Sequence, residues 1–141
     1  MKYILDTCVI SELVKPVPNP KVVEWLKQIP SEALFLCVIT IGEIHKGLTK
    51  LPDSKKKEEL THWVNTLLDE YKEKMIPIDL KVAENWGIIQ GKAEKAGTPM
   101  SSIDSLIAAA SYTYNLTLVT RNEKDFTPGN IPVINPWKKG A

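Results

Sequence analysis

The chain opens with Lys2-Tyr3-Ile4-Leu5-Asp6-Thr7, in which three residues with strand-forming side chains run directly into an acid. A carboxylate is costly to bury inside a sheet unless it emerges at an edge. The simplest arrangement is a central parallel strand whose carboxyl end opens onto a crevice, with Asp6 at its lip. This stretch therefore predicts an α/β fold with a polar site at the end of its first strand.

The segments that follow support this fold class. Apolar runs predict further strands at 34–39, 75–78 and 116–120, and a weak edge strand at 131–134. Amphipathic or capped segments predict helices at 7–14, from Pro20, from Thr40, at 54–73, at 80–96 and from Ser101 or Ser102 to about Tyr114. Alternating strands and helices form a parallel sheet with helices on both faces. We expect a three-layer α/β/α domain with four to five parallel strands and an extra helical pair within 40–73.

Length and composition indicate one soluble domain over residues 1–141. The net charge is only +1, so the whole molecule has no strong field that would attract nucleic acid. One lysine cluster forms either a solvated helix face and loop, which we favour, or a patch that tracks phosphates; its members are Lys46, Lys50, Lys55, Lys56 and Lys57.

Several features indicate a cytoplasmic protein. No apolar run approaches the roughly 18 residues that span a bilayer, and no signal peptide is visible. Cys8 and Cys37 lie in apolar surroundings, which is typical of reduced cysteines that pack in a core. His45 and His62 lack metal-ligand spacing and are expected on helix surfaces.

Four acids are expected at one edge of the predicted sheet. Asp6 ends the first strand, and Glu43 lies in the first turn of the helix expected from Thr40. Asp104 lies in the first turn of the helix before the strand at 116–120, and Asp125 follows that strand in another helical turn. Because strand ends and helix starts share one edge of a parallel sheet, the topology brings these carboxylates together.

A cluster of four carboxylates favours a bound divalent cation. Two carboxylates about 5 Å apart repel by about 3 kcal/mol at an effective dielectric constant near 20, so the cluster must bind a cation or protonate. Oxygen ligands without histidine or paired cysteine favour Mg²⁺ or Mn²⁺ over zinc. Such an ion activates a water and stabilises charge on phosphate oxygens, which suits the chemistry of phosphate esters.

The residues alone leave two other functions open. In a binding module the acids would serve only as helix caps: Asp6 could be an N-cap, and capping boxes fit Thr40-x-x-Glu43 and, more loosely, Ser101-x-x-Asp104 and Asn122-x-x-Asp125. A protein that transfers phosphate through an aspartyl-phosphate could use Asp6 as its nucleophile. Haloacid-dehalogenase-like phosphatases need an acid two residues further on, where this chain has Cys8.

An ordered set of motifs resembles the PIN-domain family, and the resemblance covers essentially the whole chain. The motifs are Asp6-Thr7, Thr40-Ile41-Gly42-Glu43-Ile44, Asp104-Ser105-Leu106-Ile107-Ala108-Ala109 and Thr120-Arg121-Asn122-Glu123-Lys124-Asp125-Phe126. The likeness is strongest to VapC-type toxins of the FitB-like branch, through the opening Asp-Thr-x-Val-Ile-Ser-Glu and the closing Asn135-Pro136-Trp137. Cys8 stands where FitB-like members usually carry Asn.

The resemblance implies an endoribonuclease that depends on Mg²⁺ or Mn²⁺, acts as the toxin of a toxin–antitoxin pair, forms a homodimer and is silenced by a cognate antitoxin protein. It implies an acidic site in which Asp6 and Asp104 are direct metal ligands; the site consists of Asp6, Glu43, Asp104 and Asp125. It also implies supporting hydroxyls at Thr7 and Thr120, and an RNA phosphate near Arg121 and Asn122. From the residues alone, a salt bridge of Arg121 to a neighbouring acid fits as well as a phosphate contact.

Overall fold

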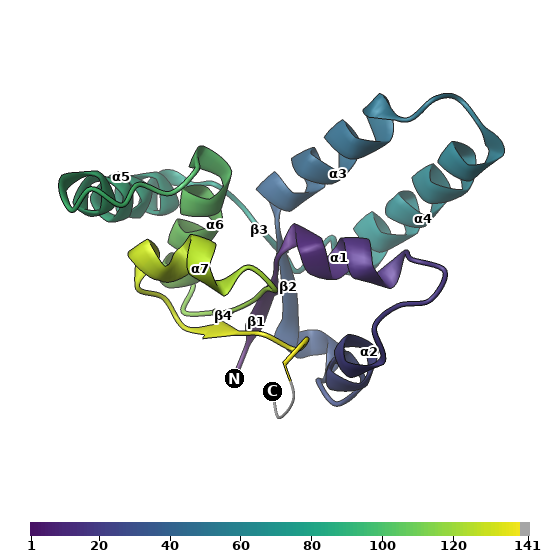
Figure 1. Ribbon diagram of the computed structural model, residues 1–141, viewed down its shortest axis with the longest axis horizontal. Coiled ribbons are helices and arrows are strands. Elements are labelled where there is room, and N and C mark those ends of the chain that lie inside the picture. Colours follow the sequence, from purple (N-terminus) through teal and green to yellow (C-terminus); the bar gives the residue numbers. More distant parts are fainter. Residues whose placement is uncertain (139–141) are drawn as a thin grey trace.

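A computed structural model describes residues 1–138, so the last three residues of the expected 1–141 domain lie outside the described part. Its centre is a five-stranded sheet in the order β3-β2-β1-β4-β5, and every pairing is parallel (Figure 1). The strands are β1 (Tyr3–Leu5), β2 (Leu34–Cys37), β3 (Met75–Ile76), β4 (Thr117–Val119) and β5 (Val133–Ile134). The predicted parallel sheet is confirmed, with the opening strand in the middle.

Helices cover both faces of this sheet, which confirms the predicted three-layer arrangement (Figure 1). They are α1 (Thr7–Leu13), α2 (Pro20–Lys27), α3 (Val38–Lys50), α4 (Lys55–Tyr71), α5 (Leu80–Lys95), α6 (Ser102–Thr113) and α7 (Glu123–Phe126). Short 3₁₀ turns occur at Ser31–Ala33 and Thr127–Gly129. In residues 1–138 no helix combines the length and apolar character that crossing a membrane requires.

The central strands feed one apolar core on each face of the sheet. Side chains alternate along a strand: Ile4 packs into the core that α5 and α6 cover, whereas Leu5 packs into the core formed with α1 and α2. Leu118 and Val119 on β4 divide in the same way. Because β1 is buried on both faces, its apolar run is continuous rather than alternating with polar residues.

The extra helical pair is confirmed as an arm made of α3 and α4 (Figure 1). The two helices project from one side of the sheet and are joined by a turn at residues 51–54. Ser54 ends this turn, and its hydroxyl accepts a hydrogen bond from the backbone N–H of Lys57 at 3.1 Å. The arm encloses one side of the region into which β1 and β2 point.

The second strand is shorter than predicted, and the helix that follows starts earlier. The apolar run 34–39 was expected to be all strand, but β2 ends at Cys37 and α3 begins at Val38. Cys37 therefore occupies the N-cap position, and Thr40 is buried in the first turn instead of capping the helix. An apolar run cannot distinguish a buried strand from a buried first helical turn, because both need apolar side chains.

The other strands also pair over fewer residues than the predicted 75–78, 116–120 and 131–134. β3 ends immediately before Pro77, and β5 begins immediately after Pro132. Proline has no N–H to donate to a ladder, so both residues limit the paired length.

The loop before α6 depends on one buried amide. Gln90 is 9% exposed; its side-chain nitrogen donates to the carbonyl oxygen of Met100 at 2.7 Å, and its side-chain oxygen accepts from the Met100 N–H at 3.2 Å.

We expect Gln90→Ala to lower the free energy of unfolding by about 1–3 kcal/mol, because both buried backbone groups lose their partners. Urea denaturation measures this. Gln28→Ala, at the exposed other glutamine, is the matched control and should cost less than about 0.5 kcal/mol; equal effects would contradict the expectation.

Candidate active site

Asp6 follows the last residue of β1 and is only 6% exposed. Its Oδ1 accepts a hydrogen bond from the Thr7 backbone N–H at 2.8 Å, which caps α1 as one alternative predicted. Its Oδ2 accepts from the Thr120 hydroxyl at 2.7 Å. These two hydrogen bonds hold the carboxylate in one orientation at the end of the central strand.

Thr7 links Asp6 to the next acid. The Thr7 hydroxyl donates to Oε1 of Glu43 at 2.5 Å, which ties the start of α1 to α3. Because α3 begins at Val38, Glu43 lies in its second turn and not in the expected first turn. The predicted capping box with Thr40 is therefore wrong, and the Glu43 carboxylate faces the first strand's site instead of its own helix end.

The remaining two acids come from the other side of the sheet. Asp104 lies in the first turn of α6. The Ser101 hydroxyl accepts a hydrogen bond from the Asp104 backbone N–H at 3.1 Å, as the looser capping box predicted. Asp125 lies in α7, but the preceding Asn122 makes no side-chain capping bond, so that predicted cap is wrong. In residues 1–138 no backbone N–H donates to the carboxylates of Glu43, Asp104 or Asp125. Capping therefore accounts for the carboxylate of Asp6 alone.

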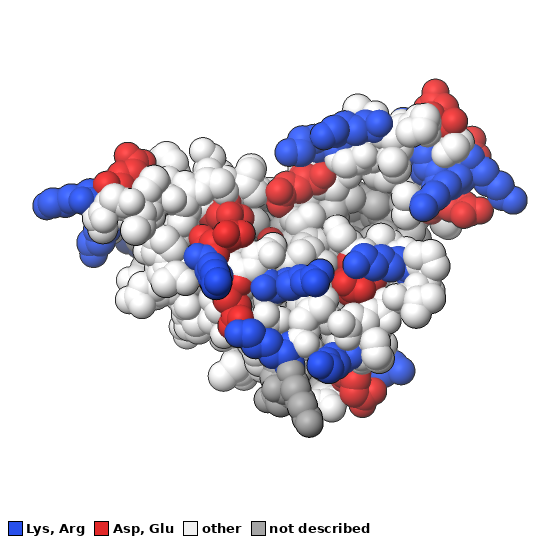
Figure 2. Space-filling view, in the orientation of Figure 1, with Lys and Arg blue, Asp and Glu red and all other residues white. Residues whose placement is uncertain are grey.

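The four acids interact through their charges. Partial burial raises the pKa of the Asp104 carboxyl, and the negative charges of Asp6, Asp125 and Glu43 raise it further. Figure 2 shows acidic side chains gathered on the face where α6 and α7 meet the start of α3, beside a hollow between these elements. Carboxylates from four separate elements thus share one electrostatic environment.

The donor set fits a hard divalent cation, although its atoms are not assembled around a single point. In the described residues 1–138 no three His, Cys, Asp or Glu side chains form a group that could already hold a metal ion. All four converging groups are carboxylates, the preferred ligands of Mg²⁺ and Mn²⁺. Besides burial, the negative charges of the other three acids raise the pKa of Asp104, and a bound cation would offset those charges.

Cys8 packs against an apolar core as predicted, and it also lies in this site. Its sulfur is 3.6 Å from Oδ2 of Asp6 and 3.5 Å from the Thr120 hydroxyl, and it accepts the Arg121 backbone N–H at 3.4 Å. Burial, and then the charge of Asp6, raise the pKa of the thiol, which favours its neutral form. Cys37 is buried in the core as expected, and both cysteines are free.

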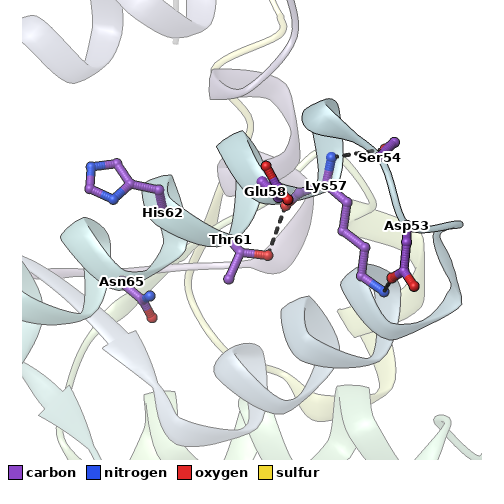
Figure 3. Close-up of a pocket in the computed structure, with 7 residues that line it drawn as sticks. All are labelled: Asp53, Ser54, Lys57, Glu58, Thr61, His62 and Asn65. Atoms are coloured by element: carbon purple, nitrogen blue, oxygen red, sulfur yellow. Dashed lines mark hydrogen bonds and ion pairs between the residues drawn. The ribbon is translucent and has the colours of Figure 1, made fainter.

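A separate hollow of about 410 Å³ lies at the outer end of the arm, where α4 begins (Figure 3). Its lining comes from the turn and the first part of α4: Asp53, Ser54, Lys57, Glu58, Thr61, His62 and Asn65. Lys57 pairs with Asp53 at 3.3 Å, and the Thr61 hydroxyl donates to the carbonyl of Lys57. These groups satisfy one another on a solvated surface, so this hollow offers no convergent chemistry. His45 and His62 are both exposed, as expected.

Comparison with known families decides among the functions left open. The description "PIN domain" matches residues 3–127, which include all four acids. The chain belongs to the PIN-domain family. The predicted resemblance is confirmed, and an aspartyl-phosphate mechanism gains no support from it.

Relatives of this PIN-domain chain are named as toxins and ribonucleases. It is 34% identical to Toxin FitB of Neisseria gonorrhoeae over 135 residues, which cover 95% of this chain and 97% of that protein. It is 29% identical to VapC ribonuclease Y4jK of Sinorhizobium fredii over 136 residues, covering 96% and 97%. The structure of FitAB bound to a DNA fragment contains a chain that matches with a TM-score of 0.93 and 32% identity, covering 99% of this chain and 98% of that one. The predicted toxin-type ribonuclease is confirmed.

The raised pKa of Asp104 gives this PIN domain a testable pH dependence. A carboxyl whose folded-state pKa is raised holds its proton in the folded state after the unfolded chain, with a pKa of about 3.9, has released it. Stability is therefore lost as pH rises from the unfolded pKa through the folded one. We expect Asp104→Asn to raise the thermal midpoint in metal-free buffer at pH 7 and to give no such gain near pH 3.

Differential scanning fluorimetry across this pH range measures the effect. Asp69→Asn, on the exposed side of α4, is the matched control and should change the midpoint little at either pH. A lower midpoint for Asp104→Asn at pH 7 would mean that crowding of the four acids does not destabilise the folded chain.

Proposed function

We propose that this toxin-type ribonuclease hydrolyses RNA phosphodiester bonds at the edge of the sheet where Asp6, Glu43, Asp104 and Asp125 meet, and that these four carboxylates hold Mg²⁺ or Mn²⁺. The observation that carries the proposal is the fixed placement of two of these acids, since the Thr120 hydroxyl donates to Asp6 and the Thr7 hydroxyl donates to Glu43. Burial first, and then the charges of Asp6, Asp125 and Glu43, raise the pKa of the Asp104 carboxyl. Four acids brought together at an electrostatic cost leave a negative charge that a bound cation would balance.

Each side chain of the site has a separate task in this proposal. Thr120 and the Thr7 N–H orient Asp6, and the Thr7 hydroxyl orients Glu43, so two carboxylates are positioned before any ligand binds. Asp104 and Asp125 complete the set from α6 and α7. When bound, the ion supplies an activated water and stabilises negative charge on the phosphate oxygens. Arg121 and Asn122, both exposed next to Thr120, lie where they can contact a substrate phosphate.

The partner proposed for this toxin is a cognate antitoxin, as in the solved FitAB complex from the gonococcus. An apolar groove of about 190 Å³ between α1, α3 and α4 offers it a docking place. Its floor is apolar, and it ends at the site's own Thr7 and Glu43; the apolar lining includes Ile10, Val14, Ile44, Leu48, Leu60 and Trp63. A segment seated here would reach the acidic site, which explains how one protein could silence the activity.

We also propose a homodimer through the exposed face of α5. Ile88 on this face is 56% exposed, and a Cβ added at Gly91 would meet nothing within 4 Å. If two copies of α5 cross antiparallel about a two-fold axis, Ile88 of each copy can pack over Gly91 of the other. The same register brings Glu84 next to Lys95 of the partner copy, twice. The face is therefore self-complementary in both shape and charge.

Removing the carboxylate charges should abolish catalysis. We expect Asp6→Asn, Glu43→Gln, Asp104→Asn and Asp125→Asn each to lower kcat/KM for RNA cleavage by at least about 100-fold, comparable to the loss of a major transition-state contact. Cleavage of a fluorescent RNA in Mg²⁺ or Mn²⁺ measures this, and EDTA should stop it. Glu94→Gln, at an exposed acid on α5, is the control.

Metal binding gives a readout that does not depend on activity. Titration calorimetry should show Mn²⁺ binding to the antitoxin-free protein that is weakened in Asp6→Asn and Asp104→Asn. The proposal fails if the unaltered protein cuts no RNA with either ion, or if these two variants cut as fast as the parent.

The dimer surface is tested by placing a charge at its centre. Ile88→Glu places one buried carboxylate from each copy against Gly91 of the other. Sedimentation velocity should therefore show mainly monomer at micromolar concentration. Val17→Glu, at a side chain that is 85% exposed in the loop before α2, is the matched control and should leave the dimer intact. A dimer that survives Ile88→Glu would exclude this surface.

A further inference from the structure

After β5 the chain continues through Asn135-Pro136-Trp137, and the Trp137 side chain reaches α1. Side-chain hydrogen bonds to Glu12 and to the Arg121 carbonyl attach this closing segment, and one further bond lies within it. The indole N–H of Trp137 donates to Oε1 of Glu12 at 3.3 Å, and the Trp137 backbone N–H donates to Oδ1 of Asn135 at 2.9 Å. The Asn135 side-chain nitrogen donates to the carbonyl oxygen of Arg121 at 3.4 Å. The segment thereby connects the end of α1 with the loop that follows β4.

Glu12 is a firm anchor for this segment. It is 5% exposed, and its two carboxylate oxygens accept from the Asn19 N–H at 3.0 Å and from the Lys15 ammonium at 3.1 Å as well as from Trp137. These contacts, the backbone N–H of Asn19 first, lower the pKa of Glu12, so it stays ionised at neutral pH. The Trp137 ring is therefore fixed at one edge by a buried and fully engaged acid.

The ring held in this way lies under Arg121. The guanidinium carbon is 5.8 Å from the centroid of the Trp137 ring, within cation–π range. In residues 1–138 Arg121 forms no ion pair with an aspartate or glutamate, unlike the salt bridge that the residues alone left open. Its positive charge is thus available to a ligand, and it is the only arginine of the chain.

Arg121 also directly adjoins the acidic site. Its backbone N–H donates to the Cys8 sulfur, and the preceding residue, Thr120, donates to Asp6. Arg121 is exposed, and a guanidinium that lies over an aromatic ring can still donate its N–H groups to a phosphate. The contact with the ring also restricts a long side chain that would otherwise lose rotamer entropy on binding.

We propose that Trp137 is a positioning residue: held by Glu12 and Asn135, its ring keeps the Arg121 guanidinium at the rim of the carboxylate site, where it binds a phosphate of the RNA strand. This inference rests on the proposed function, since it names how the same site receives its substrate. It assigns to the closing Asn135-Pro136-Trp137 a role in substrate binding rather than in packing alone.

A double-mutant cycle on RNA binding tests the proposal. The variants are Arg121→Ala, Trp137→Leu and their combination, and the probe is a fluorescent single-stranded RNA whose anisotropy is followed in EDTA, so that no cleavage occurs. We expect each single change to weaken binding by about tenfold at low salt. The slope of log K against log[salt] should fall by about 0.7, the value for one lost phosphate contact on a single strand.

The decisive result is the double variant, which should bind no more weakly than Arg121→Ala, because Trp137 acts only through that side chain. Trp25→Leu is the matched control, since Trp25 is another tryptophan of the same core that packs against Tyr3 and lines neither the acidic site nor the groove, and its salt slope should be unchanged. Trp137→Phe keeps an aromatic face without the indole donor and should retain part of the slope. Additive losses, or an unchanged slope in Trp137→Leu, would overturn the proposal.

Two further outcomes separate this inference from the proposed function. If the unaltered protein cleaves RNA in Mn²⁺ but the cycle is additive, Trp137 only packs and the ribonuclease proposal stands. If the cycle shows coupling while no RNA is cleaved with either ion, the phosphate contact stands and the proposed catalytic site is wrong. Thermal midpoints of all variants, recorded in the same buffer, confirm that each is folded at the assay temperature.

Discussion

Burial of the Asp6 carboxylate is the constraint on which the site depends. A carboxylate that is 6% exposed must find hydrogen bonds inside the protein, and here it receives them from the Thr7 N–H and the Thr120 hydroxyl. The second donor is available because β1 pairs with β4 with Leu5 opposite Val119, so the next residues of both strands emerge together. A shift of one residue in that register would turn Thr120 to the other face and leave Asp6 without this partner.

The same edge of the sheet collects charge that the fold does not neutralise. Glu43, Asp104 and Asp125 reach it from three helices. Burial, and then the charges of Asp6, Asp125 and Glu43, raise the pKa of the Asp104 carboxyl. Such crowding opposes stability in the absence of a ligand, and apolar cores on both faces of the sheet compensate for it. This negative charge is what the proposed cation would balance.

Basic side chains lie beside this acidic centre. The lysines of the arm are exposed apart from Lys57, which pairs with Asp53, consistent with the solvated face that we favoured. Figure 2 shows basic side chains on the same face as the acidic group, and Arg121 directly follows the residue that holds Asp6. The C-terminal segment links this arginine to α1, so the two ends of the chain jointly shape one side of the site.

The prediction of fold class was accurate because hydrophobic patterns act locally. The buried run 3–5, the alternation of strands with helices, and the caps at Asn19 and Ser101 each depend on a few neighbouring residues. The start of α3 was misplaced because the run around Val38 and Ile39 is apolar in either conformation. Parallel topology then indicated that four acids would converge, since strand ends share an edge whatever the details of packing.

Only the tertiary structure decided the contacts between residues far apart in the chain. The sequence predicted only a packing role for Cys8, whereas the structure also places its sulfur beside Asp6, Thr120 and Arg121. The bond between Glu12 and Trp137 has no local signal, although both residues stand in the motifs that suggested the family. Sequence by itself determined the order of strands and helices, because periodicity sets it, and the parallel topology predicted the edge at which the acids lie. The orientations of Asp6, Cys8 and Trp137 depend on partners more than a hundred residues away, and only the folded chain brings those partners together.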